Sequence, residues 1–313
     1  MGEDNRVSFP LEGDNFLGEI ETEIYTCGNH QVISVLPMSL QTNEREYRLG
    51  FVGGGKLAGA VVRGLVRAKF CAPSEILVSE PNESIRAVLQ TETSVAVTAA
   101  NHEVAVKAKT IFLGVKPGVV LPVVNELSEA IHDQLVISLA AGIRVASMEG
   151  IAKARFMRAM TNTPATVCQA ATALARGTRT SNDDLESARS IFSSIGFVAE
   201  VREDQIDAVT ALGGSGPAFV YTVIEALAAG GTKCGLPSDV SLGLATQTVR
   251  GAAELALESK LTPEELRQMV ITPGGTTAAG LAEMDRRETA AGLAAAVEIA
   301  AARGREMGLQ SGA

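Results

Sequence analysis

The sequence predicts an α/β protein in which a domain of alternating strands and helices is followed by a domain built of helices alone. Short apolar runs alternate with amphipathic segments from Tyr47 to about residue 201, as in a series of βαβ units. Near residues 204–207 the chain becomes rich in alanine and helical in pattern. With 313 residues, 46% hydrophobic and 20% charged, the chain is long enough for two domains of ordinary size.

The first βα unit carries a glycine-rich turn. An apolar strand from Tyr47 leads into GFVGGGKLA and an amphipathic helix, and Gly53, Gly55 and Ala58 fit the pattern G-x-G-x-x-A. The first glycine makes the turn, the second admits a pyrophosphate, and the small third residue lets the helix pack on the strand. The pattern alone is weak, but this strand-turn-helix context favours a Rossmann-type dinucleotide-binding domain over a structural glycine turn.

The remaining elements follow in order. Further strands are expected at 76–79, 95–98, 110–115, 135–138, 155–159 and 198–201, and helices from 83, near 103, at 119–131 and at 182–195. Later helices are expected at 217–230, 237–258, from 263 behind a Thr262 capping box, from 276 and at 289–307. We therefore divide the chain into an N-terminal extension (1–48), a Rossmann domain (49–206) and a helical domain (207–313).

Glu80 follows the second strand of this series, where the adenosine ribose is usually bound. A glutamate there would hydrogen-bond a 2′-hydroxyl and repel a 2′-phosphate, which favours NADH over NADPH. The alternative is that Glu80 is a solvent-exposed cap of the next helix.

Three later loops lie at the carboxyl ends of strands, where open α/β sheets bind ligands. In residues 114–117 (GVKP), Lys116 either faces the cofactor or is simply solvated. The small residues of 138–142 (SLAAG) fit a wall against a flat ring. Residues 160–164 (MTNTP) either offer amide and hydroxyl groups to the crevice or form a turn fixed by Asn162.

The segment ITPGGTTAAGLAEMD at 271–285 places two glycines and several hydroxyls at the start of a helix. Free N–H groups and the helix dipole there would accept a small carboxylate. The alternative is a Pro-Gly turn capped by threonine.

Composition limits the remaining possibilities. The net charge of −9 and the absence of basic runs argue against nucleic-acid binding, and no apolar run is long enough for a membrane span. Four scattered cysteines and three histidines argue against metal sites and disulfides and favour a reducing compartment, the cytoplasm.

The N-terminal extension is acidic. It holds nine acidic residues against three arginines, so we expect no targeting peptide. Its apolar residues form either an added strand or hairpin or a loose arm; they are Ile20, Ile24, Val32, Ile33, Val35 and Leu36.

The last helix, 289–307, is apolar most of the way round and has eight alanines among its first fifteen residues. Such a helix must be buried. About 105 residues cannot easily bury it alone, so we expect a dimer interlocked through these helices.

With ALGGSGPAF at 211–219, these motifs occur in one order, and residues 49–308 resemble pyrroline-5-carboxylate reductases. The resemblance implies reduction of 1-pyrroline-5-carboxylate to L-proline, the last step of proline biosynthesis, with NADPH or NADH, in a homodimer that assembles into a larger ring such as a decamer. A β-hydroxyacid dehydrogenase is disfavoured because no lysine follows the threonine-rich loop. A cofactor-binding sensor without catalysis is disfavoured because the site motifs are intact.

The same resemblance implies residue roles. Thr277 lies near the ring nitrogen of the substrate as the catalytic residue, and Thr272, Gly274, Gly275 and Thr276 surround its carboxylate. The implied cofactor-binding residues are Gly53, Gly54, Gly55, Lys56, Leu57, Ser79, Glu80, Asn101, Val115, Lys116, Pro117, Ala140, Ala141, Gly142 and Asn162. Glu80 departs from the small polar residue of many phosphate-tolerant relatives, which puts an NADPH preference in doubt.

Overall fold

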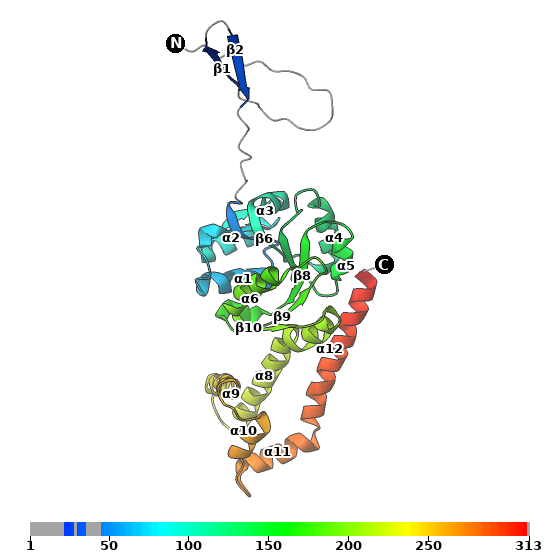
Figure 1. The fold of residues 1–313 in the computed structure, drawn as a ribbon. Coiled ribbons are helices and arrows are strands. Elements are labelled where there is room, and N and C mark those ends of the chain that lie inside the picture. The colour runs from blue at the N-terminus through cyan, green and yellow to red at the C-terminus, as the bar shows by residue number, and fades with distance from the viewer. Residues whose placement is uncertain (1–21, 28–29, 36–44, 312–313) are drawn as a thin grey trace. The chain divides into compact units, whose positions relative to one another are not determined.

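The computed structural model describes the backbone of residues 22–27, 30–35 and 45–311 (Figure 1). The chain divides into two compact units, Met1–Glu44 and Arg45–Ala313, and each is treated by itself. In the first unit, β1 (Thr22–Cys27) pairs antiparallel with β2 (His30–Val35), with Thr22 opposite Val35. The described part of this first unit is therefore a two-stranded sheet, which favours the hairpin over the loose arm. Ile20 and Leu36 lie outside the described residues.

The second unit is built on an eight-stranded sheet in the order β10-β9-β8-β7-β6-β3-β4-β5. Every neighbouring pair is parallel except β8 and β9. The strands are β3 (Tyr47–Val52), β4 (Ile76–Ser79), β5 (Ala96–Thr98), β6 (Ala108–Leu113), β7 (Leu135–Ser138), β8 (Arg155–Met160), β9 (Ala170–Arg176) and β10 (Gly196–Glu200). The predicted Rossmann-type sheet is thus confirmed.

Helices cover both faces of this sheet because side chains alternate along each strand. Phe51 and Phe112 stack with ring centroids 4.5 Å apart on the face covered by α1 (Lys56–Arg67), α2 (Glu83–Thr93) and α6 (Asn182–Ser193). The next residue, Val52, lies in the core on the other face, under α3 (Asn101–Lys107), α4 (Pro117–Glu126) and α5 (Val145–Glu149). The predicted helix 119–131 was placed too late and too long: Pro117 takes the first turn of α4, and residues beyond Glu126 form turns.

Strand β9 and helix α5 were not predicted from the sequence. Strand β9 reads AATALAR, and alanine favours a strand weakly, so its pairing with β8 decides its conformation. Helix α5 has only five residues, too few to show helical periodicity.

After α7 (Ile206–Val209) and a π-helical turn, η4 (Thr210–Gly214), the described residues as far as 311 form helices joined by loops and no strand, as predicted. The helices are α8 (Gly216–Lys233), α9 (Ser238–Glu258), α10 (Pro263–Met269), α11 (Thr276–Arg286) and α12 (Thr289–Ser311). The predicted capping box is confirmed, since the Thr262 side chain accepts a hydrogen bond from the Glu265 N–H.

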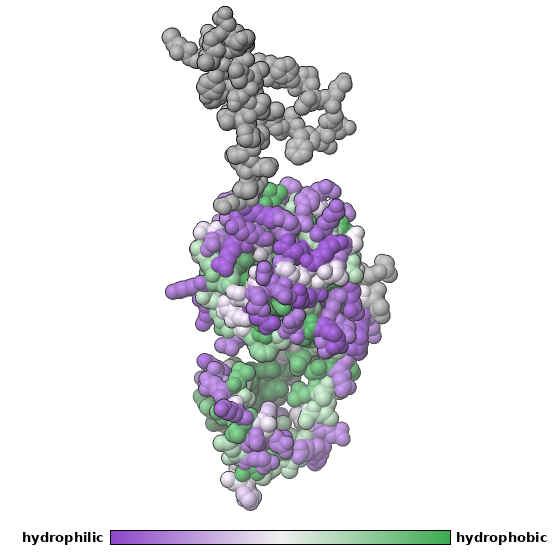
Figure 2. All heavy atoms as spheres, in the orientation of Figure 1, coloured by the Kyte–Doolittle hydropathy of each residue, from purple (hydrophilic) through white to green (hydrophobic). Residues whose placement is uncertain are grey.

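These helices expose much apolar surface within one chain. Leu257 is 78% exposed, Ile299 71% and Met269 70%, and Figure 2 shows hydrophobic residues gathered over the helical region. Helix α12 was expected to be buried, yet within this chain most of its described side chains remain accessible. Exposed apolar surface of this kind is typical of a protein–protein contact.

Candidate active site

The glycine turn between β3 and α1 has the shape that a dinucleotide requires. Gly53 has a φ of +97°, and a Cβ there would lie 2.9 Å from the Gly114 carbonyl, so only glycine fits. Gly55 is the N-cap of α1, and a Cβ there would meet nothing within 4 Å. No side chain caps the helix at this end. Open space therefore lies beside helix N-terminal amides, which fits the pyrophosphate of a nicotinamide dinucleotide.

The neighbouring residues of α1 have separate surroundings. Lys56 is exposed at the first position of the helix, whereas Leu57 is partly buried against the core. Gly54 donates its N–H to Oε2 of Glu80 at 3.0 Å.

Glu80 is buried, with 9% of its surface exposed. Besides the Gly54 bond, its Oε1 accepts the Asn82 N–H at 3.0 Å, and Asn82, not Glu80, caps α2 by accepting the Ile85 N–H. The alternative of a solvent-exposed cap is therefore wrong. Glu80 instead braces the glycine turn beside the end of β4.

Ser79 and Asn101 meet at the same edge of the sheet. The Ser79 hydroxyl lies 2.9 Å from Oδ1 of Asn101, the first residue of α3, and 3.3 Å from the Phe51 carbonyl oxygen. Only the family resemblance pointed to Asn101. The fold brings it beside Ser79, whose backbone carbonyl accepts the Gly53 N–H at 2.8 Å.

The loop after β6 places Val115 and Lys116 immediately before α4, with Lys116 as its N-cap and Pro117 at its first position. Lys116 is exposed. In the loop after β7, Ala140 and Gly142 are buried and Gly142 has a φ of +76°.

Asn162 joins the loop after β8 to β9 and to the glycine-containing turn η4. Its side-chain amide donates to the Gly213 carbonyl at 2.9 Å and accepts the Ala171 N–H at 3.2 Å. It therefore fixes a contact between segments far apart in sequence, rather than only its own turn.

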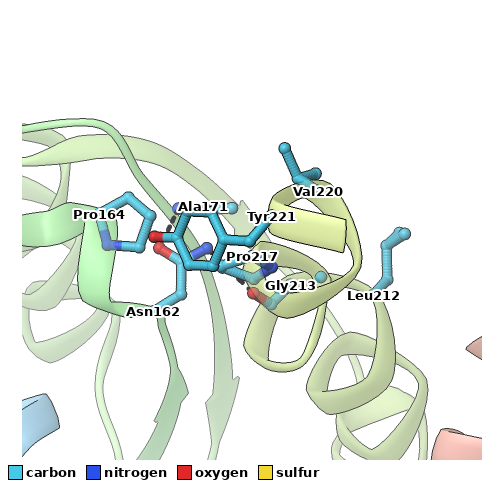
Figure 3. A pocket seen from close by; sticks show the side chains of 9 residues that line it. Asn162, Pro164, Ala171, Leu212, Gly213, Pro217, Val220 and Tyr221 are labelled. Atoms are coloured by element: carbon cyan, nitrogen blue, oxygen red, sulfur yellow. Dashed lines mark hydrogen bonds between the residues drawn. The ribbon is translucent and has the colours of Figure 1, made fainter. Parts of the chain in front are cut away.

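A mostly apolar pocket of about 300 Å³ opens beside Asn162. Figure 3 shows the Tyr221 ring turned toward Asn162 and Pro164. The residues that line the pocket are Asn162, Pro164, Ala171, Leu212, Gly213, Gly216, Pro217, Val220 and Tyr221.

The loop before α11 is closed by its own backbone. The Gly275 N–H donates to the Thr272 carbonyl at 2.9 Å, and Gly274 has a φ of +70°. A Cβ on Gly275 would lie 2.2 Å from Oγ1 of Thr272, so this hydroxyl requires a glycine beside it. Gly275 caps α11 without a side-chain hydrogen bond, so the alternative of a threonine-capped turn is wrong. The first amides of α11 and the hydroxyls of Thr276 and Thr277 remain available.

Within one chain, these two groups of residues stay apart. The cofactor candidates lie together at the carboxyl ends of the strands, whereas the start of α11 lies at the end of the helical region away from the sheet (Figure 1). Helix α11 packs against α12. A single protomer therefore does not bring the Thr272–Thr277 loop to the crevice.

In the described part of the chain, no group of three histidine, cysteine or carboxylate side chains is placed to hold a metal ion. No helix in it has the length and apolarity that a membrane span needs.

Comparison with known proteins relates the chain to one family. A family model described as pyrroline-5-carboxylate reductase dimerisation matches residues 203–307, and one described as NADP oxidoreductase, coenzyme F420-dependent, matches 48–142. The chain is 41% identical to a pyrroline-5-carboxylate reductase of Synechocystis sp., covering 83% of this chain and 98% of that one, and 39% identical to one of Pisum sativum, covering 83% and 96%.

Solved structures give the same relationship. A pyrroline-5-carboxylate reductase of Coxiella burnetii has a TM-score of 0.77 at 33% identity, covering 84% of this chain and 98% of that one. A pyrroline carboxylate reductase of Plasmodium falciparum with NADP bound also has a TM-score of 0.77, at 27% identity, covering 84% and 99%.

Proposed function

The chain belongs to the pyrroline-5-carboxylate reductase family, and we propose on that premise that it reduces 1-pyrroline-5-carboxylate to L-proline with NAD(P)H. The observation that carries this proposal is the match over nearly the whole length of curated relatives. The open glycine turn at Gly55 and the uncapped start of α11 fit the two ligands of that reaction.

The reaction needs positioning more than acid-base chemistry. When bound, the reduced nicotinamide supplies a hydride to the C=N carbon, which protonation of the imine makes electrophilic. We propose that the α11 amides with Thr272, Gly274, Gly275 and Thr276 hold the carboxylate, while the Thr277 hydroxyl orients the ring nitrogen. Glu283, two turns along α11, is an unsuitable proton donor because hydrogen bonds from Arg286 and Arg287 lower its pKa to about 2. Solvent is the proton source that fits this site.

The decisive assay uses the purified protein with 1-pyrroline-5-carboxylate and either NADH or NADPH. We expect loss of the reduced-nicotinamide absorbance with equimolar formation of L-proline. The same mixture with an open-chain 2-keto acid, the substrate class of a hydroxyacid dehydrogenase, should show no turnover. Absence of proline with both cofactors would contradict the proposal.

We propose that Glu80 disfavours the 2′-phosphate of NADPH, because a buried carboxylate at the end of β4 would repel it. Glu80→Ser is therefore expected to raise the ratio of kcat/KM for NADPH to kcat/KM for NADH by about tenfold or more. Affinity for both cofactors should also fall, since the brace on the Gly54 N–H is lost.

The control is Glu83→Gln, an exposed carboxylate in the first turn of α2, which should leave the cofactor ratio unchanged. If Glu80→Ser lowers the affinity for NADH and for NADPH equally, Glu80 only stabilises the glycine turn through the Gly54 N–H and does not affect the choice of cofactor.

We further propose that the active site is completed across a homodimer. The exposed apolar faces of α9 and α12 support mutual burial by two copies, and the matched dimerisation family supports that mode of assembly. Interlocked helices would then carry the Thr272–Thr277 loop of one protomer to the crevice of its partner. Assembly of such dimers into a larger ring, such as a decamer, is part of the same proposal.

The domain division at 206 and 207 also stays a proposal; α7 begins at Ile206, where the helical part of the chain starts. We propose the cytoplasm as the location, a reducing compartment that suits the free thiols of Cys71, Cys168 and Cys234.

A further inference from the structure

A charged side chain lies inside the sheet where it contacts the helical part of the chain. Arg158 on β8 is 2% exposed. Because side chains alternate along a strand, it lies on the same face as Phe156 and Met160, opposite Met157 and Ala159. Only its Nη1 has a hydrogen bond, to Oε1 of Glu203 at 3.4 Å, while Nε and Nη2 are buried without a partner.

Burying a guanidinium is costly unless opposite charges lie close. Those charges come from the segment that enters the helical domain: Glu203, and buried Asp207 on α7, which also lies 3.9 Å from Nη2 of Arg144. Desolvation lowers the pKa of Arg158, whereas Glu203 and Asp207 act in the opposite direction. The charge cluster therefore ties β8 to the start of the helical domain.

Glu203 has a second contact at the same atom. Its Oε1 accepts the Val145 N–H at 2.6 Å, and Val145 begins α5, three residues after Gly142. Val145 follows the loop of residues 139–144, which begins after β7. At the start of this loop, the Ala140 N–H donates to Oγ of Ser138 at 3.3 Å. Ser138 is the last residue of β7 and pairs in register with Arg158 of β8. Arg158 and its partner thus lie beside both ends of loop 139–144.

The backbone of α12 also lies close to this loop. A Cβ on Gly142 would lie 3.3 Å from the Gly308 nitrogen, so the two backbones approach closely. The loop is therefore enclosed by the sheet, by Glu203 and by the end of α12.

We propose that Arg158 and Glu203 are positioning residues for the cofactor loop: the Arg158 guanidinium orients the Glu203 carboxylate, which anchors the Val145 N–H and so holds Ala140–Gly142 as a rigid wall beside the nicotinamide. This inference rests on the proposed function for the identity of the ligand. The anchor itself is a property of the protein without ligand. A fixed wall lowers the entropy that cofactor binding must remove, so loosening it weakens cofactor affinity.

The test compares Glu203→Ala, which removes the acceptor, with Glu203→Gln, which keeps an acceptor oxygen for Val145. Asp204→Ala is the matched control, because Asp204 is the adjacent carboxylate and is exposed, and its side chain is hydrogen-bonded by Arg202 and not by the Val145 N–H. The readouts are amide hydrogen exchange of residues 139–148 without cofactor, the dissociation constant of NADH by fluorescence titration, and the two KM values.

In Glu203→Ala we expect the amide hydrogens of residues 139–148 to exchange at least about tenfold faster than in the parent protein. The NADH dissociation constant should rise about five- to tenfold, and the KM for the imine should be unchanged. For Glu203→Gln, the exchange rates and the NADH dissociation constant should stay within about threefold of the parental values. For Asp204→Ala, both quantities should equal the parental values. Arg158→Met should weaken NADH binding as Glu203→Ala does. If Arg158→Met does not fold, the two Glu203 variants still test whether Glu203 anchors the loop.

Unchanged exchange and unchanged NADH affinity in Glu203→Ala would overturn the proposal, as would a Glu203→Gln variant as impaired as Glu203→Ala. A parent protein that makes no proline would instead contradict the proposed function, and the exchange experiment would still test the anchor.

Discussion

Gly55→Val is expected to raise the dissociation constant for NADH and NADPH at least about 100-fold while changing Tm by only a few degrees. Gly55 has a φ of −63° and a ψ of −172°, a conformation open to any residue, and a Cβ there would meet nothing within 4 Å. The valine is therefore tolerated by the fold. It fills the space that the pyrophosphate must enter, against the uncapped amides of α1.

Two measurements check this prediction, a fluorescence titration of the cofactor and a thermal melt. Gly53→Ala is the contrasting variant: its φ of +97° and the 2.9 Å approach to Gly114 make alanine strained, so Tm should fall as well. If Gly55→Val binds cofactor normally, the open space beside α1 is not the pyrophosphate site.

Thr277→Ala is expected to lower kcat/KM for pyrroline-5-carboxylate about 100-fold, with cofactor affinity nearly unchanged. Removing one oriented hydrogen-bonding group from a transition state typically has an effect of this order. Thr277 is half-buried at the second position of α11, beside amides that no side chain caps. Steady-state kinetics and a cofactor titration provide the test.

Thr232→Ala is the control, because that exposed helical hydroxyl only donates back to the Ala228 carbonyl. It should have parental kinetics. Equal rates for Thr277→Ala and the parent protein would remove Thr277 from the mechanism.

The two variants together test whether the site is shared. If the loop of one protomer serves the crevice of its partner, a mixed dimer of Gly55→Val and Thr277→Ala contains one intact site. Random co-assembly of equal amounts should then restore about a quarter of parental activity. Activity that stays at the level of the separate variants would place each site within a single chain.

Much of the fold could be predicted from the sequence because it is encoded locally. The strand-turn-helix at Tyr47–Arg67 and the capping box at Thr262 each depend on residues a few positions apart, and both formed as expected. Strand β9 could not be predicted, because its alanines adopt a strand only beside β8 and β10.

The candidate site divides in the same way. Sequence alone identified the glycine turn and the Gly274–Thr277 loop, whose conformations follow from missing Cβ atoms and uncapped helix amides. It could not foresee that Glu80 would accept the Gly54 N–H, or that Asn162 would bind the Gly213 carbonyl.

The sequence by itself therefore determined the fold class, the two candidate ligand-binding loops and the family. Only the tertiary structure decided that these loops lie apart in one chain, that Glu80 is a buried brace, and that Arg158 meets Glu203. The physical reason is distance along the chain: Arg158 and Glu203 are 45 residues apart, and Val145 and Glu203 are 58 apart. Local propensity cannot encode such contacts, which arise only when packing of the sheet against the helical domain buries a charge and requires its partner.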